Sequence, residues 1–434
     1  MDPTTEMRCF KAAKITPEMT EVLKERARKG RLWSVIATSA AKSGHPGGAL
    51  SSMDIYMTLL ASANVTPDNS DCMERDRIVI SHGHTSAGYY SALAAYGFFK
   101  PEEMYPNFRR TCSPFQGHVE REVPGVDWGT GNLGQGLAAG VGFAIAARAR
   151  GSNARTWVVM GDGEQVKGQV AEARRIAVKE KLNNLTVLVD WNDIQISGRI
   201  EEVMPVNIPE LWKADGWHVI ECDGHSYHQI YDAMRHAVTH VGCFVILCRT
   251  VIGKGVSFMQ NIPDYHGKAA SGEDLATALR ELGADMEMFE KALEMRKGDL
   301  PKGRKVEVFT PDLDTGTPVT YTKDDKKDNR GAFGKALAQV GELNYKKEGR
   351  TPIVVFDCDL AGSVKVDGFA KVCPDNFVQA GIQEHSTATV AGAASTAGVV
   401  SLWAGFGVFG ADEVYNQQRL NDINRASVKV VLTH

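Results

Sequence analysis

Two polar side chains follow two predicted strands and could together hold a metal ion. Asp162 comes directly after one apolar run, and Asn192 follows a second apolar run further along the chain. Between the two runs, residues 169–181 show the apolar spacing of a helix. A strand–helix–strand unit implies two parallel strands whose carboxyl ends meet at a ligand crevice. We therefore expect Asp162 and Asn192 to lie close together at that edge of a sheet.

The oxygen atoms of these side chains suit a hard divalent cation. A carboxylate and an amide oxygen are typical ligands of Mg²⁺, with Ca²⁺ as a possible alternative, and Mg²⁺ usually arrives with phosphate oxygens. Gly161 and Gly163 flank the aspartate, allow close approach of the backbone to a phosphate, and open the predicted helix. The pattern indicates a metal–phosphate site, although a simple turn between a strand and a helix would show the same three residues.

Histidines in glycine-rich segments form a second group of candidates. His45 lies in SGHPGG, which we predict to be a loop, and a short strand, 77–81, leads into HGH with His84 at its end. A lone loop histidine is usually solvated, but neighbouring glycine and proline restrict its geometry and favour a role in a site. The segment 129–136, GTGNLGQG, matches a dinucleotide motif but follows no predicted strand, so we exclude a dinucleotide site there.

Composition limits the class of protein. The 434 residues suffice for two or three domains, and the net charge of −4 gives no basic surface for nucleic acid. No apolar run is long enough for a membrane-spanning helix. Eight scattered cysteines without a CxxC pair, together with an N-terminus lacking a secretory apolar core, predict reduced thiols in a cytoplasmic protein.

A proline- and lysine-rich stretch divides the chain. We predict an α/β domain over 1–300, a linker over 301–328 and a second α/β domain over 329–434. Each domain is expected to be doubly wound, with a mostly parallel sheet and helices on both faces. The second domain ends directly after a predicted strand and looks incomplete.

Eight motifs occur in an order that resembles the transketolases. They are SGHPGG, SHGHTSA, GHVE, GTGNLGQG, GDG with Asn192, YHGK, DLAGS and GIQEH. The resemblance covers nearly the whole chain, and it implies a diphosphate-binding domain followed by a pyrimidine-binding domain. It also implies the cofactors thiamine diphosphate and Mg²⁺. The expected reaction transfers a two-carbon glycolaldehyde unit from a ketose phosphate to an aldose phosphate through a thiamine diphosphate carbanion.

The resemblance further implies a role for individual residues. The metal ligands would be Asp162, Asn192 and the carbonyl of Ile194. The cofactor would be bound by His84, Gly131, Leu133, Gly161, Asp162, Gly163, Asn192, His266, Asp359, Glu384, Phe406 and Phe409. The sugar substrates would be bound by His45, His118, His266, Arg330, Ser363 and His434. The catalytic groups would be Glu384, on the pyrimidine ring of the cofactor, together with His45, His118 and His266.

The resemblance has consequences for assembly, and it leaves alternatives open. The family builds each site between two subunits, so a homodimer is implied, and a separate chain could supply the part that follows in the family. Three positions depart from the family pattern: Lys167, Gln383 and Asp412. A different thiamine diphosphate enzyme, such as 1-deoxyxylulose-5-phosphate synthase, remains an alternative. A split enzyme or a non-catalytic cofactor-binding protein is another.

Overall fold

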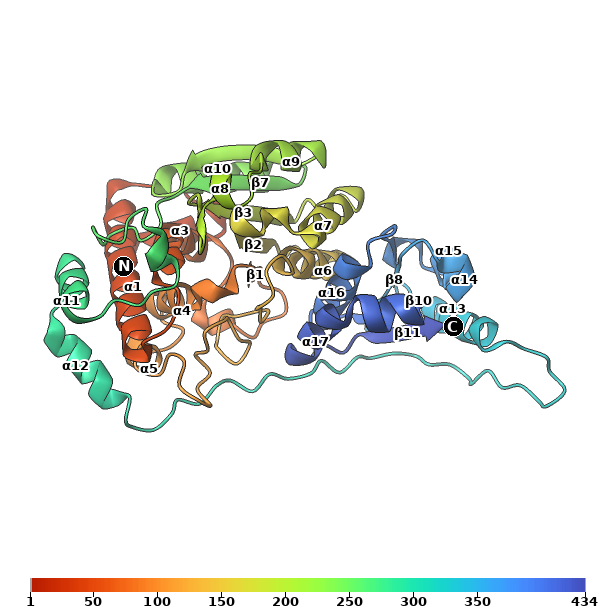
Figure 1. Ribbon diagram of the computed structural model, residues 1–434. Coiled ribbons are helices and arrows are strands. Elements are labelled where there is room, and N and C mark those ends of the chain that lie inside the picture. The colour runs from red at the N-terminus through yellow and green to blue at the C-terminus, as the bar shows by residue number, and fades with distance from the viewer. Residues whose placement is uncertain (1, 434) are drawn as a thin grey trace.

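The chain folds around two parallel sheets, each with helices on both faces (Figure 1). The computed structural model describes residues 2–433. The first sheet has five strands in the order β1-β2-β3-β7-β6. Their bounds are β1 (Arg77–Ile80), β2 (Thr156–Gly161), β3 (Leu185–Trp191), β6 (His218–Asp223) and β7 (Phe244–Arg249). A small hairpin, β4 (Ile194–Gln195) and β5 (Gly198–Arg199), follows β3. The predicted α/β fold class is confirmed.

Both faces of the first sheet are buried, which explains the continuous apolar runs of its strands. In β1, Ile78 and Ile80 pack on one face and Val79 on the other, as alternation along a strand requires. The first face is covered by α1 (Pro17–Ala41), α3 (Met53–Ser62), α4 (Ser86–Ala95) and α10 (Tyr227–Thr239). The second face is covered by α6 (Gly136–Ala149), α7 (Gly168–Lys179) and α9 (Ile208–Ala214). The remaining helices of this part are α2 (Pro46–Ser51), α5 (Pro101–Met104), α8 (Ile200–Val203), α11 (Gly272–Glu281) and α12 (Met286–Met295).

The second sheet has four parallel strands in the order β11-β10-β8-β9. Their bounds are β8 (Ile353–Asp357), β9 (Phe377–Gln379), β10 (Val400–Phe406) and β11 (Lys429–Thr433). The helices are α13 (Asn329–Asn344), α14 (Ala361–Val364), α15 (Asp367–Val372), α16 (Glu384–Ser395) and α17 (Tyr415–Ile423), with a π-helical turn, Val408–Glu413, after β10.

Helices α6 and α16 form the junction between the two sheets, and one apolar core runs across it. Both helices carry small residues where they meet. A Cβ atom placed on Gly142 of α6 would lie 2.3 Å from the carbonyl oxygen of Val390 and 3.0 Å from the Cβ of Ala393 in α16. The backbones therefore approach as closely as their atoms allow.

The segment 301–328 contains neither helix nor strand and runs along the outside of both parts (Figure 1). Arg304 fixes its beginning. The guanidinium donates from Nε to the carbonyl of Arg121 and from Nη2 to the carbonyl of Val126, each at 2.7 Å, and the main-chain amide donates to the carbonyl of Glu122 at 2.7 Å. The start of this segment is thus attached to the first part of the chain.

One sequence prediction of local structure was wrong. SGHPGG is not a loop throughout, because α2 begins at Pro46, and proline is well tolerated in the first turn of a helix. Further along the chain, Gly283, whose φ of +79° is the left-handed conformation, separates α11 from α12. In the described part of the chain, no helix has the length and apolarity needed to cross a bilayer.

Candidate active site

A cavity of about 160 Å³ lies at the carboxyl ends of β1, β2 and β3. Its lining residues are Gly48, His82, His84, Thr85, Leu133, Gly161, Asp162, Gly163, Glu164, Asp190, Asn192, Ile194, Gln195, Ile196 and His266. The structure therefore brings together the three predicted metal ligands with His84, Leu133, His266 and the two glycines. They converge because parallel strands deliver their carboxyl ends to one edge of the sheet.

The oxygens at this edge fit a divalent cation. Asp162 is 4% exposed, and burial followed by the charges of Asp190 and Asp193 raises its pKa well above the usual value. One carboxylate oxygen accepts the amide of Asp193 at 2.7 Å, and the side-chain oxygen of Asn192 accepts the amide of Ile194 at 3.0 Å. No ion pair within residues 2–433 neutralises Asp162. Burying this carboxylate without a counter-charge costs free energy. A cation bound by Asp162, Asn192 and the Ile194 carbonyl would offset that cost, with phosphate oxygens completing its coordination.

A side chain at Gly161, Gly163 or Gly131 would not clash with the rest of the protein. A Cβ at Gly161 or Gly163 would make ordinary contacts, 3.5 Å to His82 and 3.4 Å to Gln195, and a Cβ at Gly131 would meet nothing within 4 Å. None of these three glycines has a positive φ. Their lack of a side chain therefore keeps space clear for a ligand, as a phosphate cradle requires. Gly131 itself does not line the cavity.

Glu164 is a residue of the site that sequence reasoning missed. Its carboxylate accepts the amide of Gly161 at 3.0 Å and, through the other oxygen, the amide of Gly134 at 2.7 Å and the hydroxyl of Ser81. Burial raises the pKa of Glu164 to about 7. Glu164 thus ties the loop of Gly161–Gly163 to the loop that precedes α6. Its place directly after GDG was the only signal in the sequence.

Asp190 is a second residue that was missed. It is buried at the end of β3 and accepts hydrogen bonds from the hydroxyls of Ser51, Ser52 and Thr250. These bonds fasten the end of α2 and the segment after β7 to the sheet. Ser52 also bonds the ring of His82 at 3.1 Å. Asp190 therefore holds the elements on either side of the cavity.

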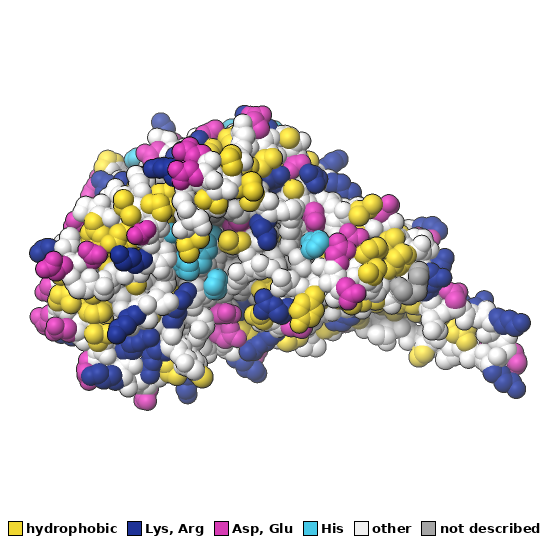
Figure 2. Space-filling view, in the orientation of Figure 1, with side chains coloured by type: hydrophobic (Ala, Val, Ile, Leu, Met, Phe, Trp, Pro, Cys, Tyr) yellow, Lys and Arg dark blue, Asp and Glu magenta, His cyan; other side chains and the backbone are white. Residues whose placement is uncertain are grey.

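Three histidines from three segments meet beside the cavity. The rings of His84 and His266 stack with centroids 5.5 Å apart, and the His45 ring lies 5.0 Å from His84 and 5.7 Å from His266. Burial, and then the charge of His266, lowers the pKa of His45 to about 4. Buried Nδ1 atoms of His45 and His266 have no partner within residues 2–433. Figure 2 shows histidines gathered on the face in view, over the part that carries the five-stranded sheet. Neutral imidazoles with free nitrogens can exchange hydrogen bonds with a polar substrate.

His118 does not line the cavity but lies near His45. Its main-chain carbonyl accepts the hydroxyl of Tyr90 at 2.9 Å, which fixes the backbone, while its side chain is partly buried. Burial, and then the charge of Arg109, lowers the pKa of His118. The charge of Arg109 also lowers the pKa of His45, as a smaller cause than burial and the charge of His266. His118 and Arg109 thus lie next to the cluster of His45, His84 and His266.

The predicted residues of the second part do not reach this cavity within the chain. Glu384 is buried at the start of α16, and burial followed by the charges of Glu413 and Glu172 raises its pKa. The remaining placements are as follows: Phe406 and Phe409 stack with centroids 5.9 Å apart, Arg330 donates to the carbonyl of Ser363 at 3.2 Å, and the amide of Asp359 donates to Gln379 at 2.7 Å. His434 lies outside the described residues. The site residues thus form two groups, one on each part.

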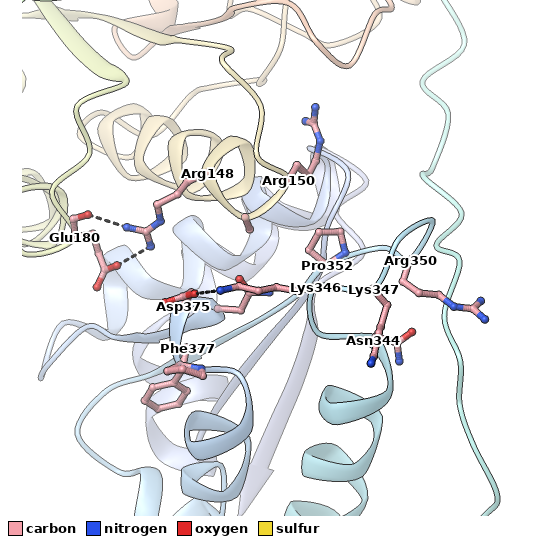
Figure 3. A pocket seen from close by; sticks show the side chains of 13 residues that line it. Arg148, Arg150, Glu180, Asn344, Lys346, Lys347, Arg350, Pro352, Asp375 and Phe377 are labelled. Carbon is pink, nitrogen blue, oxygen red and sulfur yellow. Dashed lines mark hydrogen bonds and ion pairs between the residues drawn. The ribbon is translucent and has the colours of Figure 1, made fainter.

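Another cavity, of about 710 Å³, contains none of the predicted site residues. It lies between the ends of α6 and α13, where Figure 3 shows cationic side chains paired with acids. Arg148 pairs with Glu180 at 2.7 Å and Lys346 with Asp375 at 2.6 Å. Cations at helix C-termini are explained by the helix dipole. The smaller cavity at the sheet edge is therefore the candidate active site.

Comparison with known proteins agrees with this geometry. The sequence model of the family described as "Transketolase, thiamine diphosphate binding domain" matches residues 22–298. A relative from Phocaeicola vulgatus, named as one of the subunits of an apulose-4-phosphate transketolase, is 36% identical over 274 residues, which are 62% of this chain and 97% of that protein. Mouse transketolase is 29% identical over 424 residues, which are 95% of this chain but only 65% of the mouse protein.

Solved structures extend the likeness to both sheets. The transketolase of Campylobacter jejuni superposes with a TM-score of 0.80 at 28% identity, and the match covers 95% of this chain and 69% of that one. The family match lies over the part that carries the cavity, and the structural match includes the second sheet as well. The chain therefore belongs to the transketolase family of thiamine-diphosphate-dependent transferases.

Proposed function

We propose that this chain transfers a glycolaldehyde unit from a ketose phosphate to an aldose phosphate. The observation that carries the proposal is the convergence of Asp162 and Asn192 with buried neutral histidines at one sheet edge. Thiamine diphosphate, when bound, supplies the carbon nucleophile to which the two-carbon unit is attached during transfer. The metal would be Mg²⁺, with Ca²⁺ as an alternative, because the candidate ligands are all hard oxygens.

The residues of the cavity divide into two tasks. Asp162, Asn192 and the carbonyl of Ile194 would hold the metal, and the cleared space at Gly161 and Gly163 would receive the diphosphate. The remaining cofactor residues of the first part would be His84, His266, Gly131 and Leu133. The task of His45, His118 and His266 would be to take protons from sugar hydroxyls and return them, because burial lowers the pKa of each imidazole and keeps it neutral.

The second group of residues supports a site shared between two chains. Glu384 lies on the other part of the chain from Asp162, and no residue after His266 lines the cavity. We propose a homodimer in which residues 1–300 of one subunit bind the diphosphate. Residues 329–434 of the other subunit would bind the pyrimidine ring through Glu384, Asp359, Phe406 and Phe409. Arg330, Ser363 and His434 would bind the sugar phosphate. A separate chain that contributes a further part of the site is the alternative assembly.

The proposed location is the cytoplasm. All eight cysteines are free thiols, and five of them are buried. Free thiols are typical of a reducing compartment.

A turnover assay tests the proposed function. Purified protein is incubated with xylulose 5-phosphate and ribose 5-phosphate, with and without thiamine diphosphate and Mg²⁺, and the sugar products are measured. We expect turnover only with both cofactors. Apulose 4-phosphate belongs in the same panel, because a relative is named for it. Cofactor binding without turnover on any sugar would favour the non-catalytic alternative, and turnover of pyruvate with glyceraldehyde 3-phosphate would favour the synthase.

A further inference from the structure

Gln169 is a buried polar residue in the first turn of α7 that bonds the second part of the chain. Its Nε2 group donates to the carbonyl of His385 at 3.2 Å and to the hydroxyl of Thr389 at 3.1 Å. Its Oε1 atom accepts the side-chain amide of Gln417 at 2.9 Å. The main-chain carbonyl of Gln169 accepts the hydroxyl of Ser386, also at 2.9 Å. One residue of the first part is thus bonded to both α16 and α17.

These bonds gather at the end of α16 that carries Glu384. The helix begins at Glu384, and His385, Ser386 and Thr389 lie in its first two turns. Glu172, one turn further along α7, accepts the amide of Ser386 at 2.8 Å. The close backbone contact between α6 and α16 lies further along α16 and is apolar. The polar contacts from α7 therefore hold the part of α16 where Glu384 lies.

A glutamine fixes this contact more strictly than an apolar residue would. Burying an amide costs free energy unless its hydrogen bonds are made, and here both the Nε2 group and the Oε1 atom of Gln169 have partners. Hydrogen bonds weaken steeply when they are misaligned, whereas apolar packing has no preferred direction. A displaced first turn of α16 would leave buried polar groups of Gln169, His385 and Thr389 unpaired.

We infer that Gln169 is a positioning residue that holds the first turn of α16, and with it Glu384, in place for catalysis. The inference rests on the proposed function, in which Glu384 binds the pyrimidine ring of the cofactor. Gln169 does not line the cavity of Asp162 and Asn192, so it acts on Glu384 through the helix and not through the metal or the diphosphate. Loss of its bonds should impair the step that depends on Glu384 and leave binding of the metal and diphosphate largely intact.

The test compares Gln169→Leu with Arg150→Gln as the matched control. Leucine is apolar and removes every side-chain bond of Gln169, whereas Arg150 joins the two parts at the other end of α16, where it donates to the carbonyl of Ala397 at 3.2 Å. We measure kcat with xylulose 5-phosphate and ribose 5-phosphate, and separately the Kd of thiamine diphosphate with Mg²⁺ by titration calorimetry. Gln169→Leu should lower kcat about 10- to 100-fold, because small displacements of a catalytic group are costly, with little change in that Kd. Arg150→Gln should match the parent in both.

A measurement without cofactor separates this inference from the proposed function. Hydrogen–deuterium exchange, followed by mass spectrometry on the cofactor-free protein, reports how firmly each end of α16 is held. Peptides covering 384–389 should exchange about 10-fold faster in Gln169→Leu, whereas peptides covering 395–400 should not, and Arg150→Gln should leave 384–389 unchanged. This result would support the positioning of the helix even if the parent turned over no sugar.

Two outcomes would overturn the inference. One is unchanged exchange over 384–389 in Gln169→Leu, and the other is a rise in the cofactor Kd as large as the fall in kcat. If Gln169→Leu does not fold, as judged by its melting temperature, Thr389→Val decides by the same measurements. That variant removes one acceptor of Gln169 and keeps the shape of the side chain, so its effects should have the same direction and a smaller size.

Discussion

Replacing Asp162 by asparagine should have opposite effects on the free and the cofactor-loaded protein. Asp162 is buried without a cation, and burial followed by the charges of Asp190 and Asp193 raises its pKa. The unfolded chain keeps the usual pKa, so between the two values it binds fewer protons than the folded chain. The free energy of unfolding therefore falls as pH rises through that interval. Asparagine does not titrate, so the free energy of unfolding of Asp162→Asn does not fall over this pH interval. The free variant should therefore be at least as stable as the parent at pH 7.

With thiamine diphosphate and Mg²⁺ bound, the parent should be more stable than Asp162→Asn. A ligand at a hundredfold excess over Kd stabilises the folded state by about 2.7 kcal/mol. The entropy of unfolding, about 2.1 cal/mol/K per residue, amounts to about 0.9 kcal/mol/K over 434 residues. Thiamine diphosphate with Mg²⁺ should thus raise the Tm of the parent by about 3 °C. Asp162→Asn lacks the charge that attracts the metal and should lose most of that rise.

Differential scanning calorimetry at pH 7 and pH 5, with and without cofactor, measures both effects. The difference between the free proteins should shrink at pH 5, because the parent loses stability only as pH rises above the ordinary pKa of this carboxyl toward its raised value. Asp193→Asn is the comparison: its charge contributes to the raised Asp162 pKa, so the variant shifts the free protein in the same direction, but the Asp193 side chain is 50% exposed and the variant should keep the cofactor-induced rise. An unchanged cofactor-induced rise in Asp162→Asn, combined with a less stable free protein, would refute the reasoning and leave Asp162 a structural carboxylate.

Three further predictions concern the other groups of the site. Glu164→Gln keeps only one acceptor oxygen, so it loses either the Gly161 amide or the pair formed by the Gly134 amide and the Ser81 hydroxyl. It should cost about 1–3 kcal/mol of unfolding free energy at pH 5, measured by denaturant titration, and the cost should shrink at pH 8, because the parent loses stability as pH rises through the raised Glu164 pKa of about 7. The pKa of His45 is lowered to about 4, so its imidazole resonance should not shift above pH 5 in an NMR titration, and a midpoint near 6.5 would contradict its burial. Mixed dimers of Glu384→Gln and Asp162→Ala should recover up to about a quarter of parental turnover, and no recovery in proven mixed dimers would place both residues in one subunit's site.

The meeting of Asp162 and Asn192 at one edge of the sheet could be predicted from the sequence, because it depends on local order along the chain. Asp162 and Asn192 each follow an apolar run, and parallel pairing brings such positions together without knowledge of the rest of the fold. The bonds that hold this edge in place could not be predicted in the same way. Asp190 accepts from Ser51 and Ser52, more than one hundred residues earlier, and nothing near either serine indicates that contact.

Edge strand β6 could not be predicted from the sequence. Its residues, HVIECD, include polar side chains that remain exposed, and Cys222 alone is fully buried. An edge strand that faces solvent lacks the continuous apolar run of the central strands, so apolar patterning did not reveal it. The candidate histidines could be selected from the sequence without an apolar pattern. Glycine and proline next to His45, and glycine next to His84, indicate irregular backbone at the end of a strand or helix.

The contact between α6 and α16 limits how the site can open and close. Many two-domain enzymes admit substrate by rotating one domain about a hinge, which requires an interface that can separate or slide. Here the backbones meet at Gly142 with no room for a side chain between them, and one apolar core continues across the contact. Parting the two sheets would expose that core, and sliding them would drive main-chain atoms together. Access to the cavity must therefore be controlled by local movement of loops or by whatever covers it from outside, with the two sheets acting as one rigid frame.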